Sequence, residues 1–199
     1  MTAETFRKDK YLRAAGYNFY VWAAVNLLVT WPLWAALAGR PWPTLLALLF
    51  PIGLIAAAVV LVVQNDNRVE KMWGEPNAQP LVEAGAFWGP TLLIAFVLTV
   101  VLVVRGPAAY VQPVWLLLVG AAYLTWGIFG VREFRWFGAT LIGAGTLAGL
   151  VVRPDQIPPG LPSREALVVW VVFMGVLWVP FGAYINRKYV HPSSAGSAN

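Results

Sequence analysis

Residues 138–149 contain four glycines and three alanines and carry no charged side chain. They lie within an apolar run that extends from residue 136 to residue 152. In water such a segment would form a poor helix, because each glycine costs about 1 kcal/mol relative to alanine. In a lipid bilayer the backbone has to form its own hydrogen bonds, so a helix is nearly forced. The stretch therefore predicts a membrane-spanning helix.

Small residues recur four positions apart in this stretch, as they do where membrane helices pack closely. The pairs are Ala139/Gly143, Ala144/Ala148 and Gly145/Gly149. Because the pairs lie on several faces, we expect a central helix that is contacted on more than one side. The alternative is a glycine-rich span with no special position.

The composition predicts an integral membrane protein with a single domain. Of the 199 residues 59% are hydrophobic and 12% are charged, whereas a soluble domain has about 25% charged residues. The chain has no cysteine, and its one histidine is His191. This excludes disulfides, iron–sulfur clusters, thiolate zinc sites and histidine pairs that hold haem or metal. We expect no cofactor and no metal.

Six apolar runs are each close to the ~20 residues that cross a bilayer. They are residues 17–37, 44–63, 86–104, 114–131, 136–152 and 166–185. If the N-terminus is cytoplasmic, the inner segments contain Arg7, Lys8, Lys10, Arg13, Arg68, Lys71, Arg132, Arg135, Arg187 and Lys188. The outer loops then contain only Arg40, Arg105, Arg153 and Arg164. This asymmetry follows the positive-inside rule.

The resulting prediction is an all-α, polytopic membrane protein with six transmembrane helices and both termini cytoplasmic. Residues 1–16 form an N-terminal tail, 17–185 the transmembrane domain and 186–199 a C-terminal tail. The net charge of +5 fits basic residues that flank helices, so we expect no nucleic-acid partner. We expect the protein to lie in a bacterial plasma membrane.

Prolines interrupt several spans and remove a backbone donor from each. Pro32, Pro51, Pro90 and Pro180 lie within apolar runs. Kinked helices bow apart and can leave a cavity, whereas the alternative is that the kinks fit curved packing.

The cores of the six runs contain no ionisable side chain, which counts against a proton-coupled pump, an ion transporter or an intramembrane protease. Asn26 is near the middle of the first run and shares a face with Asn18 and Trp22. We expect its amide to face the interior, bound to another helix or to a ligand. Interhelical bonding alone is the alternative. Membrane threonines usually donate to the carbonyl four residues earlier.

Several of the eleven tryptophans lie deep within the runs and could line a pocket for a flat or long apolar ligand. Filling the space between helices is the alternative. The candidate ligand-binding residues are Trp22, Asn26, Trp31, Thr99, Trp126, Thr146 and Trp178.

Four local patterns resemble the Insig (insulin-induced gene) family of six-helix membrane proteins. They are Gly53…Ala56-Ala57-Ala58-Val59-Val60, Gly74-Glu75-Pro76, Trp126…Phe129…Arg132…Arg135…Gly138 and Gly182…Ile185…Arg187. Gly130 stands where the family has an acidic residue, which leaves a family-like protein partner in question. The resemblance implies a non-catalytic protein that binds a sterol or similar neutral lipid among its helices.

The leading hypothesis is a non-enzymatic, regulatory membrane protein that binds a neutral lipid, either diacylglycerol-like or sterol-like. The alternative is a transporter, or a substrate-capture subunit of one, for a small neutral solute. A lipid-modifying enzyme is a third class, but no cluster of acids, histidines or metal ligands supports it, so we predict no catalytic residues. A homo-oligomer or a membrane-protein partner is compatible with the sequence.

Overall fold

The computed structural model describes residues 3–40, 43–73, 79–105, 107–129, 131–157 and 161–189. In these ranges the chain is helical and contains no strand. Six helical regions are long and apolar enough to cross a membrane. They are Ala15–Leu37, Leu49–Arg68, Trp88–Arg105, Ala108–Ile128, Glu133–Val151 and Arg164–Tyr189. The predicted all-α fold with six such helices is thereby confirmed.

The helices extend beyond the apolar runs at most of their ends. They are α1 (Ala3–Val29), α2 (Trp31–Leu37), α3 (Thr44–Trp73), α4 (Gln79–Arg105), α5 (Val111–Phe129), α6 (Glu133–Val151), α7 (Arg164–Trp170) and α8 (Trp178–Tyr189). Short 3₁₀ turns, η1 (Ala108–Tyr110) and η2 (Pro154–Gln156), precede α5 and follow α6. The polar residues 64–73 continue α3, because a helix does not have to end where the hydrocarbon ends. Residues 74–78, which include Gly74-Glu75-Pro76, lie outside the described residues.

Two of the six spans change helical geometry partway along their length. The first changes from α1 to α2 at Thr30, two residues before Pro32. The sixth contains η3 (Val171–Val176), a π-helical segment between α7 and α8, and Pro180 follows it in α8. The predicted proline kinks therefore coincide with interruptions only in these two spans, since α3 and α4 continue through Pro51 and Pro90.

The end of α1, just before the first interruption, contacts the second interruption. A side chain on Gly175 of η3 would place its Cβ 2.4 Å from a methyl carbon of Leu27 in α1. The hydroxyl of Thr30 donates to the carbonyl of Leu27 at 2.7 Å. Carbonyls in the last turn of a helix need a donor from outside the regular backbone pattern, and this hydroxyl supplies one.

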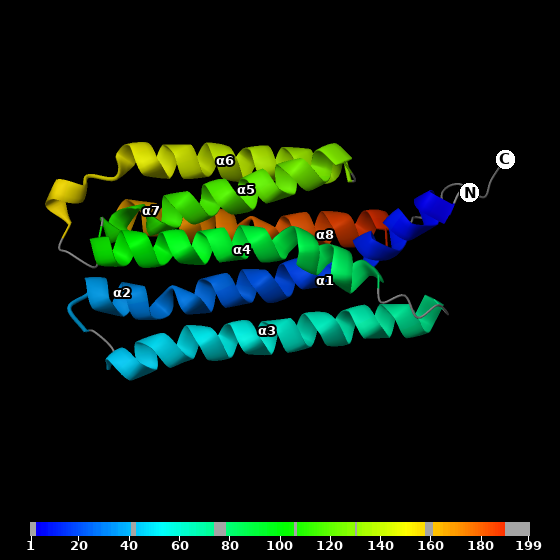
Figure 1. Ribbon diagram of the computed structural model, residues 1–199, viewed down its shortest axis with the longest axis horizontal. Coiled ribbons are helices and arrows are strands. Elements are labelled where there is room, and N and C mark those ends of the chain that lie inside the picture. Colours follow the sequence, from blue (N-terminus) through cyan, green and yellow to red (C-terminus); the bar gives the residue numbers. More distant parts are fainter. Residues whose placement is uncertain are drawn as a thin grey trace.

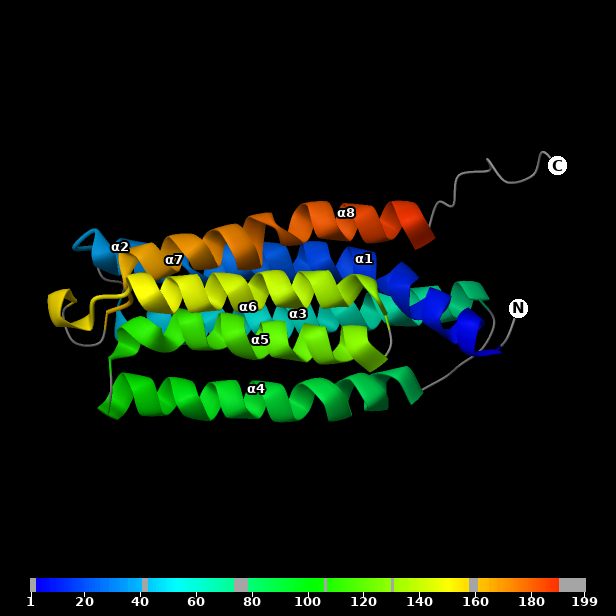
Figure 2. The ribbon, with the colours of Figure 1, turned by 90° about the horizontal axis from the view of Figure 1, so that it is seen from above.

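The spans form a ring that is open on one side. Going around the bundle, α3 packs on α1, α1 on η3 and α8, α6 on α7 and α5, and α5 on α4. Although α3 and α4 are consecutive in the chain, they make at most marginal contact with each other among the residues that the structure describes. In Figure 1 α1 appears between α3 and most of α4, and in Figure 2 α4 lies at the edge of the bundle while α3 lies behind α5 and α6. The start of α1 and the end of α8 lie at the same end of the bundle (Figure 1).

Helices α5 and α6 are in backbone contact, because glycines on both remove the intervening side chains. A Cβ on Gly138 would be 2.3 Å from the backbone nitrogen of Leu124, and one on Gly120 would be 2.8 Å from that of Ile142. Such close approach is the usual role of small residues in membrane helices.

Helix α6 is contacted on more than one side, by α5 and by α7, and is exposed on a third. Gly145 faces Leu117 of α5, and Ala144 and Ala148 are buried. Ala139 and Gly143 are exposed, and no atom lies within 4 Å of the position of a Cβ on Gly143. One of the three small pairs therefore has no packing partner within the described residues.

Candidate functional site

Aromatic side chains from four helices form the core near the end of the bundle where α1 begins. Phe19 of α1 is surrounded by Tyr123 of α5 at 5.8 Å, Phe137 of α6 at 5.4 Å and Trp178 of α8 at 5.2 Å between ring centroids. Phe137 also stacks on Phe181 of α8, with centroids 4.3 Å apart. We call these five residues the aromatic core.

Trp126 and Trp88 extend the aromatic core toward α4. Trp126 stacks beside Tyr123 at 6.5 Å, and Trp88 meets the edge of Tyr123 at 5.0 Å. Of the predicted deep tryptophans, Trp126 and Trp178 thus lie in this region. Their close ring contacts match the space-filling alternative, in which edge-to-face pairs each contribute about 0.5–1.5 kcal/mol.

One polar atom inside the aromatic core has no partner. The side chain of Trp178 is 4% exposed, and its indole nitrogen forms no hydrogen bond in the described structure. The amide oxygen of Gln112, at the start of α5, is likewise buried without a bond. Unsatisfied buried donors and acceptors are uncommon, and each costs about 1–3 kcal/mol.

Asn26 is partly buried, and its amide nitrogen donates to the carbonyl of Trp22 in its own helix at 2.8 Å. No partner for its amide oxygen is found among the described residues. The predicted interhelical bond is therefore not formed in the described part of the chain. A free acceptor remains near the middle of the first span.

The position of Asn26 follows from the neighbours on its helix. Trp22 and Val29, one turn to either side, pack against the cluster of Val21, Val25 and Ala58 that joins α1 to α3. Trp22 also packs against the larger hydrophobic cluster that contains the aromatic core. Because residues four apart share a helix face, Asn26 lies on the side of α1 between α3 and the aromatic core.

Thr99 joins two helices. Its hydroxyl donates to the carbonyl of Ala95 at 2.8 Å and accepts the indole N–H of Trp115 in α5 at 2.7 Å. The first bond is the expected one within the helix. The second was not predicted, because Trp115 is near the start of its run and has the position of an interfacial tryptophan.

Trp31 and Thr146 lie apart from the other candidates. The side chain of Trp31 is 64% exposed. Thr146 is exposed on α6, and its hydroxyl donates to the carbonyl of Ile142 at 2.9 Å. The structure therefore brings Trp22 and Asn26 together beside α3, places Trp126 and Trp178 in or beside the aromatic core, and places Thr99 between α4 and α5.

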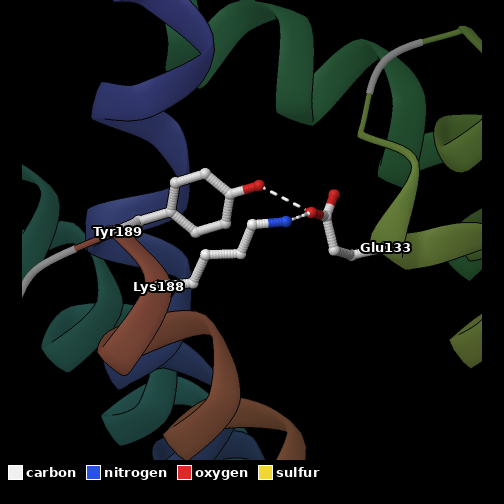
Figure 3. A network of polar contacts seen from close by, with 3 residues as sticks. All are labelled: Glu133, Lys188 and Tyr189. Atoms are coloured by element: carbon white, nitrogen blue, oxygen red, sulfur yellow. Dashed lines mark hydrogen bonds and ion pairs between the residues drawn. The ribbon is translucent and has the colours of Figure 1, made fainter. Parts of the chain in front are cut away.

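Polar contacts hold the bundle at the end where α1 begins. The amide of Asn18 in α1 donates to Asp66 in α3 at 3.2 Å and accepts from Asn65 at 3.1 Å. On the other side of the bundle, the carboxylate of Glu133 at the start of α6 is paired with Lys188 and accepts the hydroxyl of Tyr189 at 2.7 Å (Figure 3). The Asn18 bonds connect α1 to α3, and the Glu133 contacts connect α6 to α8.

The sequence singles out Asn18 but does not indicate Tyr123, Phe19 or Phe137, because a phenyl ring in an apolar run resembles any other core residue. Within the described ranges no group of three or more histidine, cysteine or acidic side chains is placed to hold a metal ion. No protein-family model, curated protein or solved structure matches the chain.

Proposed function

We propose that the chain is a non-enzymatic, regulatory membrane protein that binds a neutral lipid through Asn26. The observation that carries this proposal is the amide of Asn26, whose oxygen has no partner among the described residues. An amide oxygen without a partner in hydrocarbon is costly. A lipid hydroxyl would donate to this oxygen, and a lipid ester carbonyl would accept the remaining amide hydrogen.

The charge distribution supports a neutral ligand. The ionisable residues of the six spans lie close to the span ends, as Arg68, Arg105, Glu133 and Lys188 do. A charged headgroup at the depth of Asn26 would have no counter-ion and would cost several kcal/mol to bury. A diacylglycerol supplies one hydroxyl and two ester carbonyls, and a sterol supplies one hydroxyl. The resemblance to the Insig family implies the same class of ligand.

Mass spectrometry of lipid that stays bound to the purified protein tests this function. We expect enrichment of a neutral lipid over its share of the membrane, and we expect Asn26→Leu to remove the enrichment. Recovery of bulk phospholipid alone, in membrane proportions, would overturn the proposal. Thr146→Val is a matched control, because this exposed side chain is bonded only within its own helix.

Transport of a small neutral solute is the second candidate, and the contact between the two broken spans favours it. Interrupted helices that meet near mid-depth are typical of secondary transporters, in which freed backbone groups bind substrate. Leu27 and Gly175 meet at such a point. Solute uptake into proteoliposomes distinguishes the two functions, since a lipid-binding protein would show none.

The membrane orientation is part of the proposal. With α1 beginning in the cytoplasm, Arg68, Arg132, Arg135 and Arg187 would flank the inner side of a bacterial plasma membrane, as the positive-inside rule requires. Both terminal segments would then be cytoplasmic, where they are accessible to a protein partner.

A further inference from the structure

The open side of the ring, between α3 and α4, has the features of a lateral entrance. Around the rest of the bundle, each span packs on the next. Among the side chains that the structure describes, each of these two helices has one fully buried hydrophobic residue, Ala58 at 1% and Ala95 at 0% exposure. Most of their other described apolar side chains are exposed, and in a bilayer these would face hydrocarbon.

Each of the two helices is held by a different part of the bundle. Helix α3 is held by α1, through Ala58 and the Asn18–Asn65–Asp66 contacts. Helix α4 is held by α5, through the bond from Trp115 to Thr99 and the ring of Trp88 against Tyr123. Since α3 and α4 make at most marginal contact among the described residues, their separation can change without breaking the contacts that hold each of them to α1 or α5.

The free acceptor of Asn26 lies beside this open side. Asn26 is on the side of α1 between α3 and the aromatic core, and α4 borders that core through Trp88. A molecule that passed between α3 and α4 would approach the side of α1 that carries Trp22 and Asn26.

We propose that a diacylglycerol-like lipid enters sideways from the bilayer between α3 and α4, and that its hydroxyl binds the amide oxygen of Asn26. Its acyl chains stay between the apolar faces of the two helices. This inference rests on the proposed neutral-lipid function and adds the route and the anchoring atom. A solute from the aqueous phase would instead enter at an end of the bundle.

Cross-linking in this naturally cysteine-free chain tests the route. Cysteine pairs at Val59 and Phe96 or at Ile52 and Val103, all exposed positions of α3 and α4, would be joined by a flexible bis-maleimide. The probe is a diacylglycerol with a fluorescent acyl chain, and its release into phosphatidylcholine vesicles is timed. We expect cross-linking to slow release by about tenfold or more, which corresponds to about 1.4 kcal/mol of added barrier.

A cysteine pair at Leu54 and Val29, which pack in the cluster between α3 and α1, is the matched control, and its cross-link should leave the release rate unchanged. Unchanged release after α3 is joined to α4 would overturn the route, while probe binding by the protein without cross-links would still support the proposed function. Failure of both pairs to cross-link would also overturn the route, because the two helices would not border a common entrance. Absence of probe binding before cross-linking would overturn both proposals.

Discussion

The indole N–H of Trp115 donates to the hydroxyl of Thr99 across 2.7 Å, and that hydroxyl in turn donates to the carbonyl of Ala95. This chain of two bonds joins α5 to α4, a helix with little buried surface of its own. Thr99→Val keeps the branched shape but leaves the indole without its acceptor. We expect a loss of about 0.6–1.7 kcal/mol in unfolding free energy, the range for hydrogen bonds between membrane helices.

A double-mutant cycle with Trp115→Phe isolates this bond, because the second change should cost less once Thr99 is already valine. Unfolding in detergent measures each variant. Thr146→Val serves as control, since Thr146 bonds only within its own helix, and we expect a smaller loss there. Strictly additive effects of the Thr99 and Trp115 variants would contradict a bond that couples the two helices.

Two glycines of α6 should respond in opposite ways to the same substitution. A Cβ on Gly138 would lie 2.3 Å from the backbone nitrogen of Leu124, whereas nothing lies within 4 Å of one on Gly143. We expect Gly138→Ala to force α5 and α6 apart at a cost of about 1–3 kcal/mol. Gly143→Ala should be neutral or should stabilise by up to about 1 kcal/mol. Equal melting temperatures for the two variants would contradict the helix contact.

This contrast shows what the sequence predicts and what it leaves open. The six spans are predictable, because a bilayer requires long apolar helices and the charged residues mark their ends. The packing faces are not, because Gly138 and Gly143 both satisfy a small-residue pattern and only the position of α5 separates them. The π-helical η3 has no clear signal in the sequence beyond Gly175 and the later Pro180.

The candidate residues that could be predicted from the sequence are the polar ones that lie within apolar runs. Asn26 and Thr99 are such residues, and the structure assigns each a defined bonding pattern. Trp115 has no distinguishing local pattern, since its role depends on Thr99, sixteen residues earlier on another helix. The lack of packing between α3 and α4 is a property of the tertiary structure, and no local sequence pattern predicts it.

The hydroxyl of Tyr189 should stabilise the joint between α6 and α8. It donates to Glu133 at 2.7 Å, beside the ion pair with Lys188. We expect Tyr189→Phe to lower the unfolding free energy by about 0.5–1.5 kcal/mol. Tyr184→Phe is the control, since Tyr184 is 48% exposed, and it should stay within about 0.5 kcal/mol of the parent. A larger effect at Tyr184 than at Tyr189 would refute this assignment.

Single cysteines test the proposed orientation, because the chain supplies none of its own. Asp155, in the connection after α6, and Arg132, just before α6, are both exposed and lie at opposite ends of that helix. In intact cells, a membrane-impermeant maleimide should label Asp155→Cys and should label Arg132→Cys only after the membrane is opened. The reverse pattern would place the termini outside.

The variant Asn26→Leu tests whether Asn26 binds the ligand or only stabilises the fold. The amide of Asn26 bonds only to the carbonyl of Trp22 in its own helix, within the described structure. Its removal should therefore leave unfolding free energy within about 0.6 kcal/mol of the parent, the mean for a single hydrogen bond between membrane helices. Retention of labelled diacylglycerol should fall by about tenfold, which corresponds to about 1.4 kcal/mol of binding free energy. Asn26→Gln keeps the amide and should recover part of the binding if the longer side chain still reaches the lipid hydroxyl. Lost stability with unchanged lipid retention in Asn26→Leu would instead show that Asn26 is structural.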